Sequence, residues 1–293
     1  MLGKALVRNF SRKNKILAVS KSGRDKTIVC DLTKPKAVEN FFEGKSPDLV
    51  VHSAAYSDVD GCESHPALAH ASNALATKYL AEACGARRVP FVYISTDYVF
   101  DGKGKVPYRE NDVTFPINIY GITKLEGEHY ARERAAVSAI VRTSWLFGPE
   151  NPDTFVNAIA MRLRKEKAVS VLNDQEDSPT YVEDLAKAVE SIADRLVFFS
   201  RENPGRVLHD VFQYCNSGSC TRYEMAAKMR ECLGLKEVDL RRMDKKEIKN
   251  RVALRPSYSV MSTEHFQKTF KQKIRTWQAS LGEYLGECFL CGS

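Results

Sequence analysis

The sequence predicts an α/β fold, in which a doubly wound parallel sheet is joined to a smaller α/β lobe. Short apolar runs alternate with longer segments of helical periodicity, a pattern typical of βαβ units around a parallel sheet. The pattern becomes mixed after Gly148. Hydrophobic residues make up 43% and charged residues 28% of the 293 positions, as in ordinary globular proteins. We therefore predict two domains, over residues 1–148 and 149–293.

In the first half, apolar runs predict strands, and apolar residues at spacings of three and four predict the helices between them. The strands are expected at residues 16–19, 27–30, 49–53, 91–95 and 139–142, and the helices at 35–42, 66–84 and 118–134. In the second half, helices are expected at 153–165, 182–196 and 222–233, and strands at 168–172 and 211–215.

The net charge of +7 is compatible with nucleic acid, an anionic membrane or a phosphorylated small substrate. The densest basic stretch, residues 236–251, also holds acidic residues and has no aromatic side chains on which bases could stack. We interpret this stretch as a solvated helical or loop face, and we predict no nucleic-acid partner.

Targeting and metal signals are weak. No apolar stretch approaches the length needed to span a bilayer, and the first apolar run is too short for a signal peptide. We therefore expect a cytoplasmic protein with no membrane partner. The eight cysteines lack the regular spacing of a disulfide framework, so reduced thiols are expected. Cys288 and Cys291 form a lone CxxC without the further ligands that a zinc site needs, and no metal ligand is predicted.

The start of the chain is unusual for this class of fold. In a Rossmann fold the first strand lies centrally and feeds a glycine-rich turn, which delivers a pyrophosphate to a helix N-terminus. Residues 1–10 read as the last glycine of that turn, Gly3, and its helix, without the strand and the earlier glycines. We expect a fragment, because a sheet without its central strand leaves backbone groups unpaired. The alternative is a protein that has lost normal cofactor binding.

Tyr120 and Lys124 place a phenol and an ammonium one turn apart on the same face of a predicted helix. A tyrosine holds its proton until about pH 10, so we expect the lysine charge to lower its pKa. Such a phenol can protonate a developing alkoxide, and the lysine can hold the ribose hydroxyls of a nicotinamide. The same spacing also occurs by chance on solvated helices, so the context decides.

The context is the segment 95–102, which directly follows an apolar strand and so lies at the carboxyl end of the sheet, where α/β proteins bind ligands. The Thr96 hydroxyl can hydrogen-bond a substrate carbonyl oxygen and stabilise it as charge grows. The alternative is that Thr96 and Asp97 simply end the strand in a turn.

Several long motifs support the first interpretation. They are DLVVHSAAYSDVD at 48–60, STDYVFDG at 95–102, PYRE at 107–110, NIYG at 118–121, RTSWLFG at 142–148 and DQEDSPTY at 174–181. Together they resemble the dTDP-4-dehydrorhamnose reductase family of extended short-chain dehydrogenases/reductases, along nearly the whole chain. Phe147 replaces the usual tyrosine, and Asp177 stands where glycine is common. Residues 216–224 and 255–257 resemble the substrate-lobe segments of the same family.

The resemblance implies a role for each matching position. Thr96, Tyr120 and Lys124 would be catalytic, within a dinucleotide-binding first domain and a mainly substrate-binding second one. The cofactor, NADPH or alternatively NADH, would contact Gly3, Asp31, Leu32, Ala54, Ala55, Tyr56, Asn73, Tyr120 and Lys124. The dTDP-linked deoxysugar would contact Thr96, Asp97, Trp145, Gln175 and Thr180. Lys21 and Arg24 are candidates for binding the extra ribose phosphate of NADP, or belong to a solvated turn.

Other implications of the resemblance are less specific. Trp145 is alternatively a core residue. The family is also associated with magnesium (Mg2+), although no carboxylate cluster demands it, and a homodimer is expected.

The implied reaction is reduction of dTDP-4-dehydro-6-deoxy-L-mannose (dTDP-4-dehydrorhamnose) to dTDP-L-rhamnose, with hydride from NADPH and a proton from Tyr120. One alternative is a non-catalytic regulatory subunit, because the methionine adenosyltransferase β subunit resembles the same family. Another is a nucleotide-sugar epimerase or dehydratase, against which Trp145 and Gln175 argue. Because of its start, the chain as given is expected to bind NADPH poorly.

Overall fold

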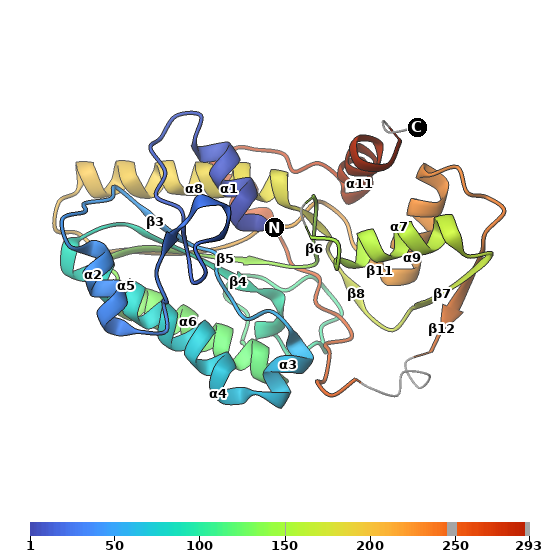
Figure 1. The fold of residues 1–293 in the computed structure, drawn as a ribbon, viewed down its shortest axis with the longest axis horizontal. Helices are drawn as coiled ribbons and strands as arrows, with labels where there is room; N and C mark the ends of the chain where they lie inside the picture. Colours follow the sequence, from blue (N-terminus) through green and yellow to red (C-terminus); the bar gives the residue numbers. More distant parts are fainter. Residues whose placement is uncertain (150, 245–250, 291–293) are drawn as a thin grey trace.

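The computed structural model describes residues 1–149, 151–244 and 251–290 (Figure 1). Its centre is a parallel sheet in the order β10-β5-β4-β3, formed by β3 (Val50–His52), β4 (Phe91–Thr96), β5 (Val137–Thr143) and β10 (Leu208–Gln213). Every residue of β4 and β5 is buried, as expected for parallel strands that are covered on both faces. The predicted α/β class is confirmed.

Helices cover both faces of this sheet (Figure 1). One face packs against α1 (Leu2–Phe10) and α8 (Val182–Glu202). The other face carries α2 (Pro35–Phe42), α5 (Ala76–Arg87) and α6 (Ile119–Arg134). Two separate apolar cores, one for each face, therefore hold the helices in place.

The start of α6 is fixed by a local signal. The Asn118 side chain accepts a hydrogen bond from the Gly121 amide at 2.8 Å, so the helix begins one residue later than predicted. The single helix predicted over 66–84 is instead divided into α4 (Pro66–Ala69), a π-helical segment η2 (His70–Leu75) and α5. Such π-helical turns are frequent at functional sites, and this one carries the fully buried Asn73.

The two strands nearest the start of the chain form a pair of their own. β1 (Val19–Ser20) and β2 (Ile28–Val29) pair in parallel, and within the described residues no strand links them to β3. The β3 strand is therefore an edge of the four-stranded sheet. The expectation that a central strand is missing from this chain stays a prediction.

The smaller lobe contains α7 (Phe155–Lys165), β7 (Ala168–Leu172), α9 (Arg222–Cys232), β12 (Asp239–Met243) and α11 (Trp277–Leu285). The interpretation of residues 236–251 as a helical or loop face is wrong for β12, which pairs in parallel with β7. The charged residues of β12 are exposed while Leu240 is buried. An edge strand of this kind has too few apolar residues to be recognised by an apolar run. Residues 245–250 of that stretch, and Cys291, lie outside the described residues.

Residues after 148 also contribute to the large sheet. The strand predicted at 211–215 is β10, which pairs with β5 instead of belonging to the smaller lobe, and α8 packs on the same layer. Short pairs connect the two parts: β6 (Leu146–Phe147) with β9 (Thr180–Tyr181), and β8 (Glu176–Asp177) with β11 (Cys220–Thr221). The remaining short elements are η1 (Arg24–Lys26), α3 (Val59–Ser64), η3 (Asp97–Val99), α10 (Glu264–Phe270) and η5 (Gly286–Leu290).

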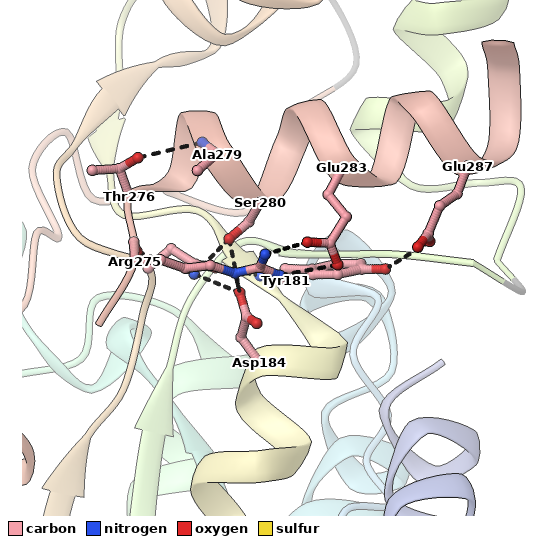
Figure 2. A network of polar contacts seen from close by, with 9 residues as sticks. Tyr181, Asp184, Arg275, Thr276, Ala279, Ser280, Glu283 and Glu287 are labelled. Carbon is pink, nitrogen blue, oxygen red and sulfur yellow. Dashed lines mark hydrogen bonds and ion pairs between the residues drawn. The ribbon is translucent and has the colours of Figure 1, made fainter. Parts of the chain in front are cut away.

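A polar network fastens α11 to the beginning of α8 (Figure 2). The Asp184 carboxylate accepts hydrogen bonds from Arg275 Nε at 2.7 Å, from Ser280 Oγ at 2.7 Å and from Asn216 Nδ2 at 2.8 Å. Asn216 also accepts a hydrogen bond from the Tyr181 amide at 2.7 Å. The network therefore fixes the segment that leads from Thr180 into α8. Across the described ranges, no helix is both long and apolar enough to cross a membrane.

Candidate active site

The residues Tyr120 and Lys124 lie on α6 beside the carboxyl end of β4. The backbone of α6 lies very close to the segment that follows β4. A Cβ atom added to Gly121 would lie only 2.1 Å from the Tyr98 carbonyl oxygen. Lys124 is almost fully buried, and its Nζ donates to the Ile94 carbonyl oxygen at 2.6 Å. The same ammonium lies 4.1 Å from the centre of the Tyr93 ring.

Burial dominates the acid–base properties of this pair. Burial lowers the pKa of Lys124 to about 7 and raises the pKa of Tyr120. The charge of Asp97 raises the Tyr120 pKa further, and a hydrogen bond with the Thr96 hydroxyl lowers it. The net pKa shift of Tyr120 is therefore upward, opposite to the lowering that was expected from the Lys124 charge, because burial dominates it. The phenol keeps its proton at neutral pH.

Thr96 is the last residue of β4, and Asp97 follows it directly. The Thr96 hydroxyl donates to Asp97 Oδ1 at 3.0 Å and accepts a hydrogen bond from the Tyr98 amide at 3.2 Å. Thr96 therefore does cap the turn that follows the strand, as the alternative interpretation holds, yet the same hydroxyl also lies beside Tyr120. The capping contacts and the predicted catalytic role are compatible.

Trp145 lies in a loop between β5 and β6 with a positive φ of 46°. Its ring stacks on Phe155 with centres 5.8 Å apart, and the Arg222 guanidinium lies 5.0 Å from the Trp145 ring centre. The ring is partly buried against the core of the smaller lobe. Trp145 therefore contributes to the core, as its alternative reading holds, and keeps a partly exposed face.

The side chains of Gln175 and Thr180 bind their own loop to the segments around Pro256 and Thr143. Gln175 Nε2 donates to the Pro256 carbonyl oxygen at 3.0 Å, and Thr180, fully buried, accepts from the Thr143 hydroxyl at 3.4 Å. The Thr180 amide donates to the Trp145 carbonyl oxygen at 3.1 Å. Their predicted contact with substrate stays a prediction.

The segments predicted to hold the cofactor follow β2 and β3, and because β3 runs parallel to β4 the turn after β3 lies on the same edge as Thr96. Ala54 and Ala55 are exposed at the end of β3 and leave room for a ligand. Asn73 Oδ1 accepts from the Tyr56 amide at 2.8 Å, and its Nδ2 donates to the Tyr56 carbonyl oxygen and the Thr123 hydroxyl, both at 3.1 Å. The turn is thereby tied to α6, the helix that carries Tyr120 and Lys124.

The remaining cofactor candidates, Asp31, Leu32 and Gly3, follow β2 or lie at the start of α1. Asp31 accepts hydrogen bonds from the Thr33 amide and hydroxyl, and it forms an ion pair with the exposed Lys21 at 3.2 Å. Leu32 packs partly against the core, and Arg24 is exposed. A Cβ atom added to Gly3 would lie 3.5 Å from Ser53 Oγ, so the first turn of α1 adjoins the end of β3. This arrangement fits a dinucleotide laid across the strand ends.

The residues that the structure describes offer no comparable set of ligands for the magnesium ion that the resemblance implied. Over residues 1–149, 151–244 and 251–290, no group of three or more His, Cys, Asp or Glu side chains could hold a metal ion. We therefore assign no ligands for the magnesium that the resemblance implied.

Sequence reasoning missed four charged residues near the site: Asp177, Arg222, Arg251 and Arg255. Arg251 pairs with Asp174 at 3.3 Å, and Arg255 pairs with Asp60 at 2.9 Å. Arg255 belongs to a motif that the family resemblance had picked out, and Asp177 departs from the usual glycine, so both carried a signal. Arg222 likewise lies within residues 216–224, which resembled the substrate-lobe segments of the family, whereas nothing in the sequence distinguishes Arg251 from a surface arginine.

Comparison with known proteins identifies the family. The family model described as "RmlD substrate binding domain" matches residues 1–289. The dTDP-4-dehydrorhamnose reductase of Streptomyces griseus is 33% identical over 293 residues, covering 100% of this chain and 91% of the relative. The spore coat polysaccharide biosynthesis protein SpsK of Bacillus subtilis is 36% identical over 257 residues, covering 88% and 85%.

Solved structures agree with this result. A dTDP-4-dehydrorhamnose reductase of Clostridium acetobutylicum has a TM-score of 0.86 and 32% identity, covering 98% of this chain and 95% of that one. The enzyme of Bacillus anthracis, solved in complex with NADP, has a TM-score of 0.82 and 28% identity, covering 96% and 95%. The predicted resemblance to the dTDP-4-dehydrorhamnose reductase family is confirmed: the chain belongs to the family described as "RmlD substrate binding domain", which its relatives of that name support.

Proposed function

We propose that this protein is an NADPH-dependent reductase that converts dTDP-4-dehydrorhamnose to dTDP-L-rhamnose. The observation that carries this proposal is the meeting of the Thr96 hydroxyl with the Tyr120 phenol at the end of β4, one helical turn from the buried Lys124. Relatives that bear the name of this reductase, and the NADP complex of one of them, support the choice of substrate and cofactor.

In this reaction NADPH would supply a hydride to the carbonyl carbon of the sugar. Tyr120 would protonate the carbonyl oxygen as negative charge develops there, and its raised pKa keeps the required proton in place at neutral pH. Thr96 would donate a hydrogen bond to the same oxygen. Lys124 would hold the nicotinamide ribose and stabilise the tyrosinate that remains after the transfer.

We assign the cofactor to the strand ends already described. Gly3, Asp31, Leu32 and the turn of Ala54, Ala55 and Tyr56, which Asn73 fixes, would hold it together with Tyr120 and Lys124. Lys21, now paired with Asp31, is our candidate for the extra phosphate of NADPH. Location in the cytoplasm and a homodimer remain predictions.

The sugar nucleotide would bind between Trp145 and three arginines, Arg222, Arg251 and Arg255. Their charges act on one another, which shows that they are close together. Arg222 Nε is buried and, in the part of the chain that the structure describes, has no hydrogen-bond partner. A guanidinium with an unpaired donor in a half-buried site favours a diphosphate. The phosphate oxygens can accept the parallel N–H groups of the planar guanidinium.

Replacing Arg222 with methionine is therefore expected to raise the KM for the sugar nucleotide roughly 10- to 100-fold, the range expected for a lost hydrogen bond to a charged group. The Kd for NADPH should stay unchanged. Steady-state kinetics and cofactor titration measure the two quantities. Arg230→Met, on the same helix α9, is the control, because Arg230 donates to the Val238 carbonyl oxygen away from the site. An unchanged KM in Arg222→Met would contradict the assignment.

The direct test of the function follows NADPH absorbance with dTDP-4-dehydrorhamnose and identifies the product. A second keto sugar is worth including, because a Streptomyces antibioticus relative, 34% identical over 284 residues, is named a probable dTDP-4,6-dihydroxy-2-methyloxan-3-one 4-ketoreductase. NADPH binding is measured separately. Binding without turnover of either sugar would favour a regulatory subunit, and epimerised sugar without net NADPH consumption would favour an epimerase.

A further inference from the structure

The crossing segment, residues 251–257, belongs to the second half of the chain but lies against the first domain. The Leu254 carbonyl oxygen accepts a hydrogen bond from Asn118 Nδ2 at 2.8 Å, and Asn118 caps the start of α6. Ser257 Oγ donates to the Gly102 carbonyl oxygen at 3.1 Å. The crossing segment therefore contacts both the start of α6 and the stretch that follows β4 and η3, and it borders the proposed catalytic centre.

Polar contacts, with little apolar burial, hold this segment in place. Val252 and Leu254 are 65% and 68% exposed, and only the small side chains of Ala253 and Pro256 are buried among its apolar residues. Asp60 Oδ1 accepts hydrogen bonds from the backbone amides of Val252 at 3.2 Å and Ala253 at 2.8 Å. One carboxylate of the first domain therefore fixes the path of the crossing segment.

The second oxygen of the same carboxylate holds Arg255. Asp60 Oδ2 accepts from Arg255 Nη2 at 2.9 Å, and the arginine side chain is only 13% exposed. Arg255 Nη1 is buried and, within the described ranges, has no hydrogen-bond partner. Because the guanidinium is planar and rigid, fixing Nη2 on Asp60 also sets the direction in which Nη1 donates. A buried donor without a partner costs free energy until a ligand satisfies it.

Asp60 itself stands on a short helix that is fastened at both ends. Asp58 Oδ1 accepts from the Gly61 amide at 3.0 Å and caps the start of α3. Near the end of α3, Glu63 Oε1 accepts from the Ile119 amide at 2.8 Å, in the first turn of α6. The turn assigned to the cofactor leads directly into α3. Asp60 therefore connects the cofactor side of the site to the crossing segment.

We propose that Asp60 is a positioning residue for the sugar nucleotide, which holds Arg255 so that its Nη1 donates to a phosphate oxygen of the diphosphate. This inference rests on the proposed function and adds the residue that orders one of its arginines. Asp60 acts through Arg255 and does not touch the ligand. Because the diphosphate is remote from the carbonyl group that reacts, Arg255 binds it equally in the ground state and the transition state. Loss of the Asp60 carboxylate therefore raises KM and leaves kcat unchanged.

Asp60→Asn tests this role, because asparagine keeps an acceptor for the two backbone amides but presents an NH2 group to Arg255 in place of an acceptor. The Kd for dTDP, measured by calorimetry, should rise roughly 5- to 50-fold, within the range of coupling between side chains in contact. The KM for the keto sugar should rise by the same factor, while kcat stays within a factor of about two. A lower kcat with an unchanged Kd would instead indicate a disturbed α6 and would overturn the proposal.

A double-mutant cycle shows whether Asp60 acts through Arg255. Arg255→Met alone should weaken dTDP binding at least as much as Asp60→Asn does. Adding Asp60→Asn to Arg255→Met should then change the Kd by less than a factor of about two. Asp58→Asn is the matched control: it removes a charge from the same turn, asparagine caps α3 equally well, and the Kd should not change. Equal weakening by Asp60→Asn in both backgrounds would contradict the proposal.

These binding measurements do not depend on turnover. If the wild-type chain binds dTDP but does not reduce the keto sugar, and Asp60→Asn weakens the binding, only the proposed function is wrong. If the wild-type chain does not bind dTDP, the role of Asp60 is wrong whatever the turnover. Thermal melting verifies that each variant is folded.

Discussion

Replacing Tyr120 with phenylalanine is expected to lower kcat by roughly 10²- to 10⁴-fold, the range of a lost general acid. The variant removes the only atom that Tyr120 would contribute to proton transfer, and it keeps the ring, whose centre lies 5.8 Å from that of Tyr98. The KM for the sugar nucleotide should change far less, because the phenol would act mainly in the transition state. Stopped-flow measurement of NADPH oxidation separates the chemical step from product release.

Tyr130→Phe is the matched control for this experiment. Tyr130 lies on the same helix, and its hydroxyl donates to the half-buried Glu126 carboxylate at 3.1 Å. Its removal should leave kcat within a factor of about two, as for most surface substitutions. A Tyr120→Phe variant that keeps wild-type turnover would show that another group supplies the proton, and it would remove the main support for the proposed mechanism.

The local structure around Thr96, Tyr120 and Lys124 was the most predictable part of the molecule, because short local signals determine it, while the catalytic roles of these residues stay predictions. An apolar strand followed by Thr96 defines a strand end, and Asn118 followed by a helical pattern defines where Tyr120 and Lys124 lie. The direction of the pKa shift of Tyr120 could not be predicted in the same way. It depends on how much of the phenol the rest of the chain shields from water, and spacing carries no information on this.

Features that arise between distant segments were also missed. Asp97 and Asp177 are brought near each other by long-range contacts, since Tyr258 forms β-bridges both with Lys103, in the loop after β4, and with Glu176, in β8. β12 was hidden because an edge strand with charged exposed positions lacks an apolar run. The strand β10 was recognised, but its place in the large sheet depends on pairing with β5, which periodicity does not encode.

A buried ion pair beneath the site connects α6 to the sheet. Arg142, on β5, donates from Nε and Nη2 to the two Glu128 carboxylate oxygens at 3.0 and 2.8 Å, and Ser95 donates to the same carboxylate at 2.5 Å. The two charged side chains are only 5% and 4% exposed. Because Glu128 lies on α6 one turn after Lys124, this pair holds α6 against β4 and β5.

Breaking this pair with Arg142→Met is expected to lower the free energy of unfolding by about 3–5 kcal/mol, because the Glu128 carboxylate is left buried without its cation. The double variant Arg142→Met with Glu128→Met should recover much of that loss, since neither charge then remains buried. Urea unfolding at constant m-value measures both effects. The control is Arg162→Met, which breaks an exposed pair with Glu166 at 2.9 Å and should cost less than about 1 kcal/mol. If Arg142→Met costs no more than this control, or if the double variant is as unstable as the single one, then the pair is not what holds α6 on the sheet.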